Sequence, residues 1–395
     1  MVFVMLLSVN FFEVGIMKDI FGGINGFVFY MVALVIIYIA FCGLGYDKSR
    51  YHGYLRPIAW IEAGLFVSFI GAYMFYGQSF FQSIISTRLF SALLAAPVFI
   101  CINPTYDETK KALYTFAIID FLFTIYAAFI DQSIVHLTEG AEFLRSESDI
   151  VRMLPGLHFS VMAFAFAVND VLERYTPNNM LMAAFLFAVL VINTNRTFLF
   201  GALMIVVLSL SYMGKSRYKG LIVGSLILVA LIFFLWTGNI FSALLEETTE
   251  QIGDTDYNRI KSLMYMFTCP NGPLSYVIGN GFISAKVNSL MPDLFAMGIF
   301  YSDVGFIGFW NQFGILTTVA ILYYVIKGLD RRHSFVVRSS AIIILCASLT
   351  IAYFSSVEKL CWLSFYLMLY YQDLMSKPEM MYKKRRQVRY RSLAG

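Results

Sequence analysis

Polar side chains lie between two long apolar stretches in the segment VINTNRTFLF, residues 191–200. Arg196 stands there together with Asn193, Asn195 and Thr197. An arginine buried in hydrocarbon costs about 2.5–3.5 kcal/mol or more, so a partner is expected. The planar guanidinium matches phosphate oxygens with paired hydrogen bonds, and asparagine amides can donate beside it. The cluster predicts a site for a phosphate or pyrophosphate; the alternative is an interfacial arginine that extends to the lipid headgroups.

A second basic pair, Arg259 and Lys261, belongs to the segment YNRIKSLMYMF. The apolar residues of this segment recur at the spacing of one helix face: Ile260, Leu263, Met264 and Phe267. The pattern predicts a short amphipathic helix that lies against the membrane surface. If this helix folds back over the turn at Arg196, the two arginines converge on one anion. The alternative is a surface ion pair between Arg259 and Asp256 or Glu250.

A carboxylate, Asp303, opens the apolar segment DVGFIGFWNQFGIL. It is a candidate general base, or a group that orients a hydroxyl, in a cleft outside the membrane. The alternative is a helix cap made by Ser302 or Asp303. Further along, Asn311 and Gln312 would be buried in lipid unless they face the bundle interior. We therefore expect them to line a cavity or to bind a neighbouring helix.

Two further carboxylates, Glu62 and Asp120, fall within apolar segments. Intramembrane acids occur in proton relays, which keeps a transporter open, but we favour a neutral, hydrogen-bonded structural acid for each. The four histidines have no metal-ligand spacing: His52, His136, His158 and His333. The sequence contains no P-loop and no serine nucleophile elbow. No metal and no cofactor are predicted.

The composition is that of an integral membrane protein. Of 395 residues, 59% are hydrophobic and 14% are charged, whereas soluble domains are about 25% charged. A spanning helix needs roughly 20 mostly apolar residues, and about twelve segments, or eleven, qualify. These are residues 1–17, 24–45, 57–76, 88–103, 112–130, 153–170, 179–195, 197–213, 219–238, 302–326, 339–355 and 359–374. The first is interpreted as a span and not a cleaved signal peptide, because no basic region precedes it.

Twelve spans place both termini on one side of the membrane. The predicted loops and tail on that side hold 20 of the 29 Lys and Arg residues, so we assign it to the cytoplasm. The predicted fold class is therefore an all-α polytopic membrane protein with one large outer loop. Its parts are nine spans over 1–238, the outer loop at 239–301, three spans over 302–374 and a basic cytoplasmic tail at 375–395.

The order of these features resembles the O-antigen and polysaccharide polymerases of the Wzy type, which are related to the O-antigen ligases. Three segments carry the resemblance. NTNRTFLFGAL is similar to the family's Arg-Thr turn at the outer end of a span. YNRIKSLMYMF, followed by VIGNGF, is similar to its loop segment with a second arginine and a Gly-x-Gly. DVGFIGFWNQFGIL is similar to the span that follows the loop.

This resemblance implies a GT-C-like glycosyltransferase of the bacterial inner membrane, with the large loop in the periplasm. The donor would be a glycan on undecaprenyl diphosphate, and the acceptor another lipid-linked repeat unit. Arg196 and Arg259 would neutralise the leaving diphosphate, and Asp303 would orient or deprotonate the attacking hydroxyl. The expected substrate-binding residues are Asn193, Asn195, Thr197, Lys261 and Asn311. A diphosphate is a good leaving group, so the reaction needs no metal.

The resemblance also implies partners and alternatives. A polymerase of this type is expected to work in the membrane lipid with a chain-length regulator and a flippase, and not with nucleic acid. A ligase carries a functional histidine near the end of its large loop, but residues 239–301 contain no histidine, which favours a polymerase. A flippase or other transporter is expected to show repeats and helices broken at Gly or Pro, and the sequence reveals neither.

Overall fold

The computed structural model describes most of the helical part of the chain. The described residues are 1–9, 11, 26–42, 55–129, 144–147, 150–153, 156–192, 196–212, 258–268, 271–283, 293–294, 297–349 and 356–376. Several predicted features lie outside them. These are Asn193, Asn195, the span at 219–238, the first part of the outer loop up to residue 257 and the basic tail from residue 377.

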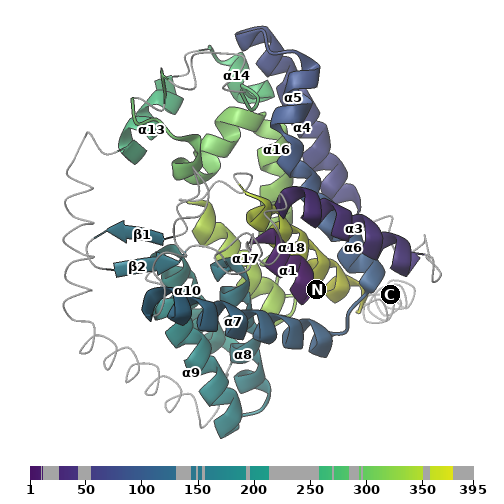
Figure 1. The fold of residues 1–395 in the computed structure, drawn as a ribbon, viewed down its shortest axis with the longest axis vertical. Coiled ribbons are helices and arrows are strands. Elements are labelled where there is room, and N and C mark those ends of the chain that lie inside the picture. Colours follow the sequence, from purple (N-terminus) through teal and green to yellow (C-terminus); the bar gives the residue numbers. More distant parts are fainter. Residues whose placement is uncertain are drawn as a thin grey trace, which may run out of the picture.

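The described residues form helices almost throughout (Figure 1). The α-helices are α1 (Val2–Ser8), α3 (Gly26–Cys42), α4 (Leu55–Tyr76), α5 (Phe80–Ser86), α6 (Ala95–Ile102), α7 (Tyr106–Phe129), α8 (Leu157–Glu173), α9 (Pro177–Ile192), α10 (Arg196–Tyr212), α13 (Asn258–Thr268), α14 (Leu274–Ile278), α16 (Gly305–Gly328), α17 (Phe335–Ser348) and α18 (Val357–Met375). Two short 3₁₀ helices are η3 (Arg88–Leu94) and η5 (Tyr301–Val304). Strands β1 (Leu144–Glu147) and β2 (Ile150–Met153), between α7 and α8 in the chain, form an antiparallel pair.

Two of the described helices are long and apolar enough to cross a membrane, at Arg56–Tyr76 and Gly305–Gly328. A third span is added if Phe80–Ser86 and Arg88–Ile102, which are bent by 59°, are one crossing. Four more described helices are apolar but shorter, including those at Thr197–Tyr212 and Phe335–Ser348. The fold is therefore that of a helical protein with membrane-crossing helices, and the total of twelve spans stays a prediction.

Burial separates central from peripheral helices. The side chains of α8 are buried on almost every face, as are those of α18 from Leu360 to Tyr370. A helix that is apolar all round belongs in a core. In contrast, α4 and α16 each expose large apolar side chains, among them Trp60, Phe66, Ile315 and Val319. A continuous exposed apolar surface of this kind fits contact with lipid.

Contacts between helix ends define how the helices run. The start of α7 meets the end of α8, where the ammonium of Lys110 lies 3.1 Å from the carboxylate of Asp170. The start of α17 meets the end of α10, where Arg338 donates a hydrogen bond to the Tyr212 hydroxyl. The predicted topology places all four of these helix ends on the same side of the membrane. Which side faces the cytoplasm stays a prediction.

Helix α16 is broken in its middle, which the sequence analysis does not anticipate. Gly314 has a φ of 74° and a ψ of 179°, values outside the helical region. The break leaves nearby carbonyl groups without helical partners, and a turn from the outer-loop region binds them. Asn280 and Gly281 donate their backbone N–H groups to the carbonyls of Asn311 and Gln312, at 2.9 and 2.7 Å. Irregular backbone is tolerated at membrane depth where protein surrounds and satisfies it.

Glycines allow this turn to fit between α4 and α16. A Cβ atom on Gly314 would lie 2.5 Å from the carbonyl oxygen of Val277. A Cβ on Gly71 of α4 would lie 1.8 Å from the carbonyl oxygen of Gly279. Gly279 and Gly281 have positive φ values of 83° and 76°, in line with the predicted turn. Residues 277–281 and the break at Gly314 thus form one packed unit, which we call the interlock.

Candidate functional site

The predicted amphipathic helix exists as α13, and it packs against η5 and α16 (Figure 1). The fully buried side chains of α13 are not those of the apolar stripe. Ser262 and Met266 are fully buried, whereas Met264 and Phe267 are 64% and 61% exposed. Met264 and Phe267 of the stripe therefore face away from the protein, whereas Ile260 and Leu263 are half-buried and Leu263 packs against the cluster that contains Met266. An amphipathic helix can place such a stripe in the interfacial layer of a bilayer, and we expect α13 to do so.

Replacing Phe267 by tryptophan tests this expectation in proteoliposomes. Brominated lipids should quench the added fluorescence, most strongly when the bromines lie near the headgroup end of the acyl chain. The reason is that interfacial helices bury their apolar face about 5–10 Å deep. The matched control is Arg332→Trp, whose native side chain is 78% exposed in the α16–α17 connection. Equal quenching of both variants would contradict membrane contact by α13.

Helix α13 holds Arg259 close to the turn that contains Asp303. The Ser262 hydroxyl accepts a hydrogen bond from the backbone N–H of Phe300 at 2.9 Å. Arg259 precedes Ser262 by three residues and is exposed, and Phe300 precedes Asp303 by three. Burial raises the pKa of Tyr301, which lies at this interface, so its phenol stays neutral. Two of the predicted catalytic residues therefore belong to elements that are in direct contact.

The start of α10, which is Arg196, lies at the same end of the bundle as η5. A Cβ on Gly201 of α10 would meet Ile343 of α17 at 3.7 Å, and the two helices run antiparallel. Arg196 is five residues before Gly201 and Ser348 is five residues after Ile343. Both therefore lie about 7.5 Å beyond this contact at 1.5 Å per residue. The position of a Cβ on Gly305 is 2.0 Å from the Ser348 carbonyl oxygen, so the end of α17 meets the start of α16, directly after the Asp303 turn.

The remaining predicted site residues differ in their burial and in the contacts that they make. Thr197 and Lys261 are half-buried and have contacts of their own. Asn311 is buried and binds a turn, at residues 279–281, and not the neighbouring helix that the sequence suggests. Its side-chain oxygen accepts a hydrogen bond from the Asn280 amide at 2.8 Å. Convergence of Arg196 with Arg259 stays a prediction, because α13 packs on η5 and α16 while α10 packs mainly on α17 and α8.

The position of α16 bears on the alternative role of Asp303. The sequence suggests that Ser302 or Asp303 caps the helix of this span. In the structure, residues 301–304 form η5, and Val304 occupies the cap position before α16 begins at Gly305. The helix therefore starts later than the predicted cap requires, and Asp303 lies in the turn that precedes it.

The two intramembrane acids have different surroundings. Glu62 is half-buried on α4. Asp120 is buried on α7 and accepts a hydrogen bond from the Ser160 hydroxyl at 2.9 Å, as the favoured reading of a hydrogen-bonded acid requires. Its carboxylate also lies beside Gly156, where an added Cβ would come within 2.4 Å of it.

A buried histidine–carboxylate pair at the start of α8 and α18 was not predicted. His158 Nδ1 lies 2.5 Å from Glu358 Oε1, and the side chains are 4% and 12% exposed. In the sequence, His158 has no neighbour at metal-ligand spacing and no other feature that distinguishes it. The available signal was the segment SSVEK, which contains Glu358 and is the one charged interruption between the last two predicted spans. A separation of 200 residues hides such a pair from any local pattern.

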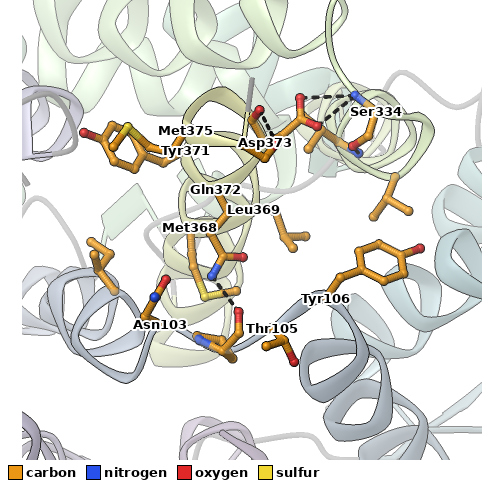
Figure 2. Close-up of a pocket in the computed structure, with 15 residues that line it drawn as sticks. Asn103, Thr105, Tyr106, Ser334, Met368, Leu369, Tyr371, Gln372, Asp373 and Met375 are labelled. Carbon is orange, nitrogen blue, oxygen red and sulfur yellow. Dashed lines mark hydrogen bonds between the residues drawn. The ribbon is translucent and has the colours of Figure 1, made fainter. Parts of the chain in front are cut away.

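A similar pair, His333 and Asp373, lies at the other end of α18. His333 Nδ1 is 2.8 Å from Asp373 Oδ2, and the side chains are 5% and 10% exposed. A cavity of about 620 Å³ lies beside it, between the ends of α6 and α18 and the starts of α7 and α17. Figure 2 shows Asp373 bound to Ser334 at its edge and Gln372 among its lining side chains. None of the predicted site residues lines this cavity.

Comparisons with known proteins add no assignment. The chain matches no protein-family model, and a search of curated proteins finds no significant match.

Proposed function

We propose that the chain is a membrane glycosyltransferase that polymerises undecaprenyl-diphosphate-linked oligosaccharide repeat units into O-antigen or a related surface polysaccharide. The observation that supports it most is the packing of α13 onto η5, with the start of α10 at the same end of the bundle. The elements that carry Arg259 and Asp303 are in contact, and the start of α10, which carries Arg196, lies toward the same end of α17 as η5. A reaction between two lipid-linked substrates needs such a site at a membrane surface.

The charges of these residues fit the proposed chemistry. In the transferase step, the acceptor hydroxyl attacks the anomeric carbon of the donor, and the bond to the diphosphate breaks. Negative charge grows on the leaving diphosphate, where one or two fixed guanidinium groups stabilise it. Arginine suits this role because its planar fork binds two phosphate oxygens together. Attack in line with the departing bond inverts the anomeric configuration.

The broken helix α16 gives the transporter alternative one feature that the sequence did not reveal. Transporters use broken helices to expose backbone groups to a substrate or ion. Here the carbonyls of Asn311 and Gln312, which the break leaves without helical partners, instead accept hydrogen bonds from the backbone N–H groups of residues 280 and 281. The break is filled by protein, which favours a structural role for it. The enzyme therefore remains our proposal, and a flippase is an outcome of the test.

Deleting the gene in its bacterial host and separating the surface glycolipids by size tests the proposed function. We expect the deletion strain to carry core with a single repeat unit, and the wild-type gene to restore the ladder of longer chains. Arg196→Ala should not restore the ladder although the protein is present in the membrane. Core alone would contradict a polymerase. Polymer accumulating on the lipid carrier would then indicate a ligase, and its absence a flippase.

A further inference from the structure

The pair formed by His158 and Glu358 joins two helices at their starts. Glu358 Oε1 accepts the backbone N–H of Gly156 at 2.9 Å in addition to its contact with His158 Nδ1 at 2.5 Å. The carboxylate is thus held by two donors from the beginning of α8. The groups that face this pair from other helices include Asp120 on α7, which Ser160 binds. Histidine oriented by a carboxylate through Nδ1 is a recurrent arrangement for proton transfer.

The second ring nitrogen of His158 has no partner among the described residues. His158 Nε2 is buried and makes no hydrogen bond there. Buried polar atoms of this kind are uncommon and call for an explanation. Since the carboxylate holds Nδ1, a neutral imidazole carries its hydrogen on Nδ1 and a free lone pair on Nε2. Nε2 is therefore the atom that can accept a proton.

Aromatic rings fix the orientation of this imidazole. The rings of Phe198 and Trp362 each have their centroid 4.8 Å from that of His158, at interplanar angles of 77° and 60°. These neighbours come from α10 and α18 and keep the ring in an apolar surrounding. Phe198 also fixes the location of the pair, because it belongs to the first turn of α10 and follows Arg196 by two residues. The imidazole thus lies beside the helix start that carries the predicted diphosphate-binding arginine.

Resting on the proposed function, we infer that His158 is the catalytic base of the transfer reaction and that Glu358 is its positioning residue. His158 Nε2 takes the proton of the acceptor hydroxyl while the oxygen bonds to the anomeric carbon. The bond from that carbon to the diphosphate breaks, and its electron pair leaves with the diphosphate. Glu358 keeps the hydrogen on Nδ1 and stabilises the imidazolium. In this assignment Asp303 orients substrate and does not accept the proton.

Purified full-length protein in proteoliposomes tests the inference. The substrate is lipid-linked repeat units extracted from the host strain that lacks the gene. His158→Asn retains a donor toward Glu358 but provides no base. We expect it to lower kcat about 10²–10⁴-fold, the usual contribution of a general base, with little change in KM. Glu358→Gln retains an acceptor for Nδ1 but removes the charge, so its loss should be smaller, and Glu358→Asp should recover part of it.

The pair at the other end of α18 provides the matched control. His333→Asn removes an imidazole from a pair of similar geometry and burial, so it reports the cost of disrupting such a pair without touching the proposed site. We expect its turnover per folded protein to equal that of wild type. Thermal unfolding of each variant in detergent measures the folded fraction.

Three results separate the outcomes. If His158→Asn extends chains as fast as wild type per folded protein, the inference is wrong while the proposed function stands. If His158→Asn and His333→Asn lose turnover equally, the pair is structural and the inference is also wrong. If wild-type protein does not extend the extracted lipid-linked units, and the deletion strain still makes the ladder of longer chains, the proposed function fails and the inference fails with it.

Discussion

Gly314→Ala is expected to destabilise the protein strongly, for two separate reasons. Gly314 has a φ of 74°, a conformation that costs an L residue about 1–3 kcal/mol. The new methyl would also lie 2.5 Å from the Val277 carbonyl oxygen and 2.7 Å from the Gly279 nitrogen. Overpacking of this kind adds about 1–3 kcal/mol. The predicted loss is therefore on the order of 2–6 kcal/mol, measured as the change in unfolding free energy or as a lowered Tm in detergent.

Two other glycines separate the causes of this effect. Gly201 lies within α10, and its added methyl would meet Ile343 at an ordinary contact distance of 3.7 Å. Gly272 has a φ of 79° but has no atom within 4 Å of an added methyl. We expect Gly201→Ala to be close to wild type, Gly272→Ala to show the backbone cost alone, and Gly314→Ala to show both. If Gly314→Ala were as stable as Gly201→Ala, the interlock would not exist as described.

The helical part of the fold was accessible from sequence because apolar runs report helices directly. The predicted spans at 57–76 and 302–326 correspond to α4 and α16, both long and apolar enough to cross a membrane. The last two predicted spans also correspond to separate helices, but α17 ends at Ser348 and not at residue 355, and α18 begins at Val357. Hydropathy succeeds here because every backbone group of a spanning segment must be satisfied within its own helix.

The interlock could not be predicted in this way, because it depends on contacts between distant segments and not on an apolar run. A glycine in an apolar run is common in spanning helices, so Gly314 carried no local sign of a break. What fixes its conformation is the pairing of Asn311 and Gln312 with residues 280 and 281, about thirty residues earlier in the chain. The bend of 59° between Phe80–Ser86 and Arg88–Ile102 was missed too, because the predicted span 88–103 covers only the second of these helices.

Helix α13 shows a different limit. Its period was predicted, but the side chains that hold it on the protein were not, because an apolar stripe in a membrane protein has two partners available. It can pack on protein or lie in the bilayer surface. In α13 the side that faces the protein includes Ser262, whose hydroxyl accepts a hydrogen bond from the backbone N–H of Phe300. Hydrophobicity alone cannot identify a face that is selected by a polar contact.

The residues of the candidate site also fall into two groups: those that the sequence reveals and those that only the packing of the helices reveals. The basic residues were found because charge is conspicuous in apolar sequence, as with Arg196 and Arg259. The pair of His158 and Glu358 was missed because neither residue has a local partner, and only the packing of α8 on α18 brings them together. A site built from residues on several helices becomes visible only when the packing of those helices is known.

The second large effect concerns the two arginines. Arg196→Ala and Arg259→Ala are each expected to lower the polymerisation rate about 10²–10³-fold in the proteoliposome assay, as removal of one charge-stabilising donor does in other transfer sites. The lysine variants should retain intermediate activity, because an ammonium keeps the charge but loses the paired hydrogen bonds. Arg331→Ala, an exposed residue after the end of α16, is the control and should be as active as wild type.

The double variant Arg196→Ala with Arg259→Ala tests whether both side chains bind one diphosphate. Residues that act on the same group are not independent, so their combined loss should be smaller than the product of the single losses. A combined loss equal to that product would place the two arginines at separate steps or on separate substrates. Such a result would match the distinct packing of α13 and α10, one on η5 and the other on α17 and α8. Wild-type activity of either single variant would remove that arginine from the reaction.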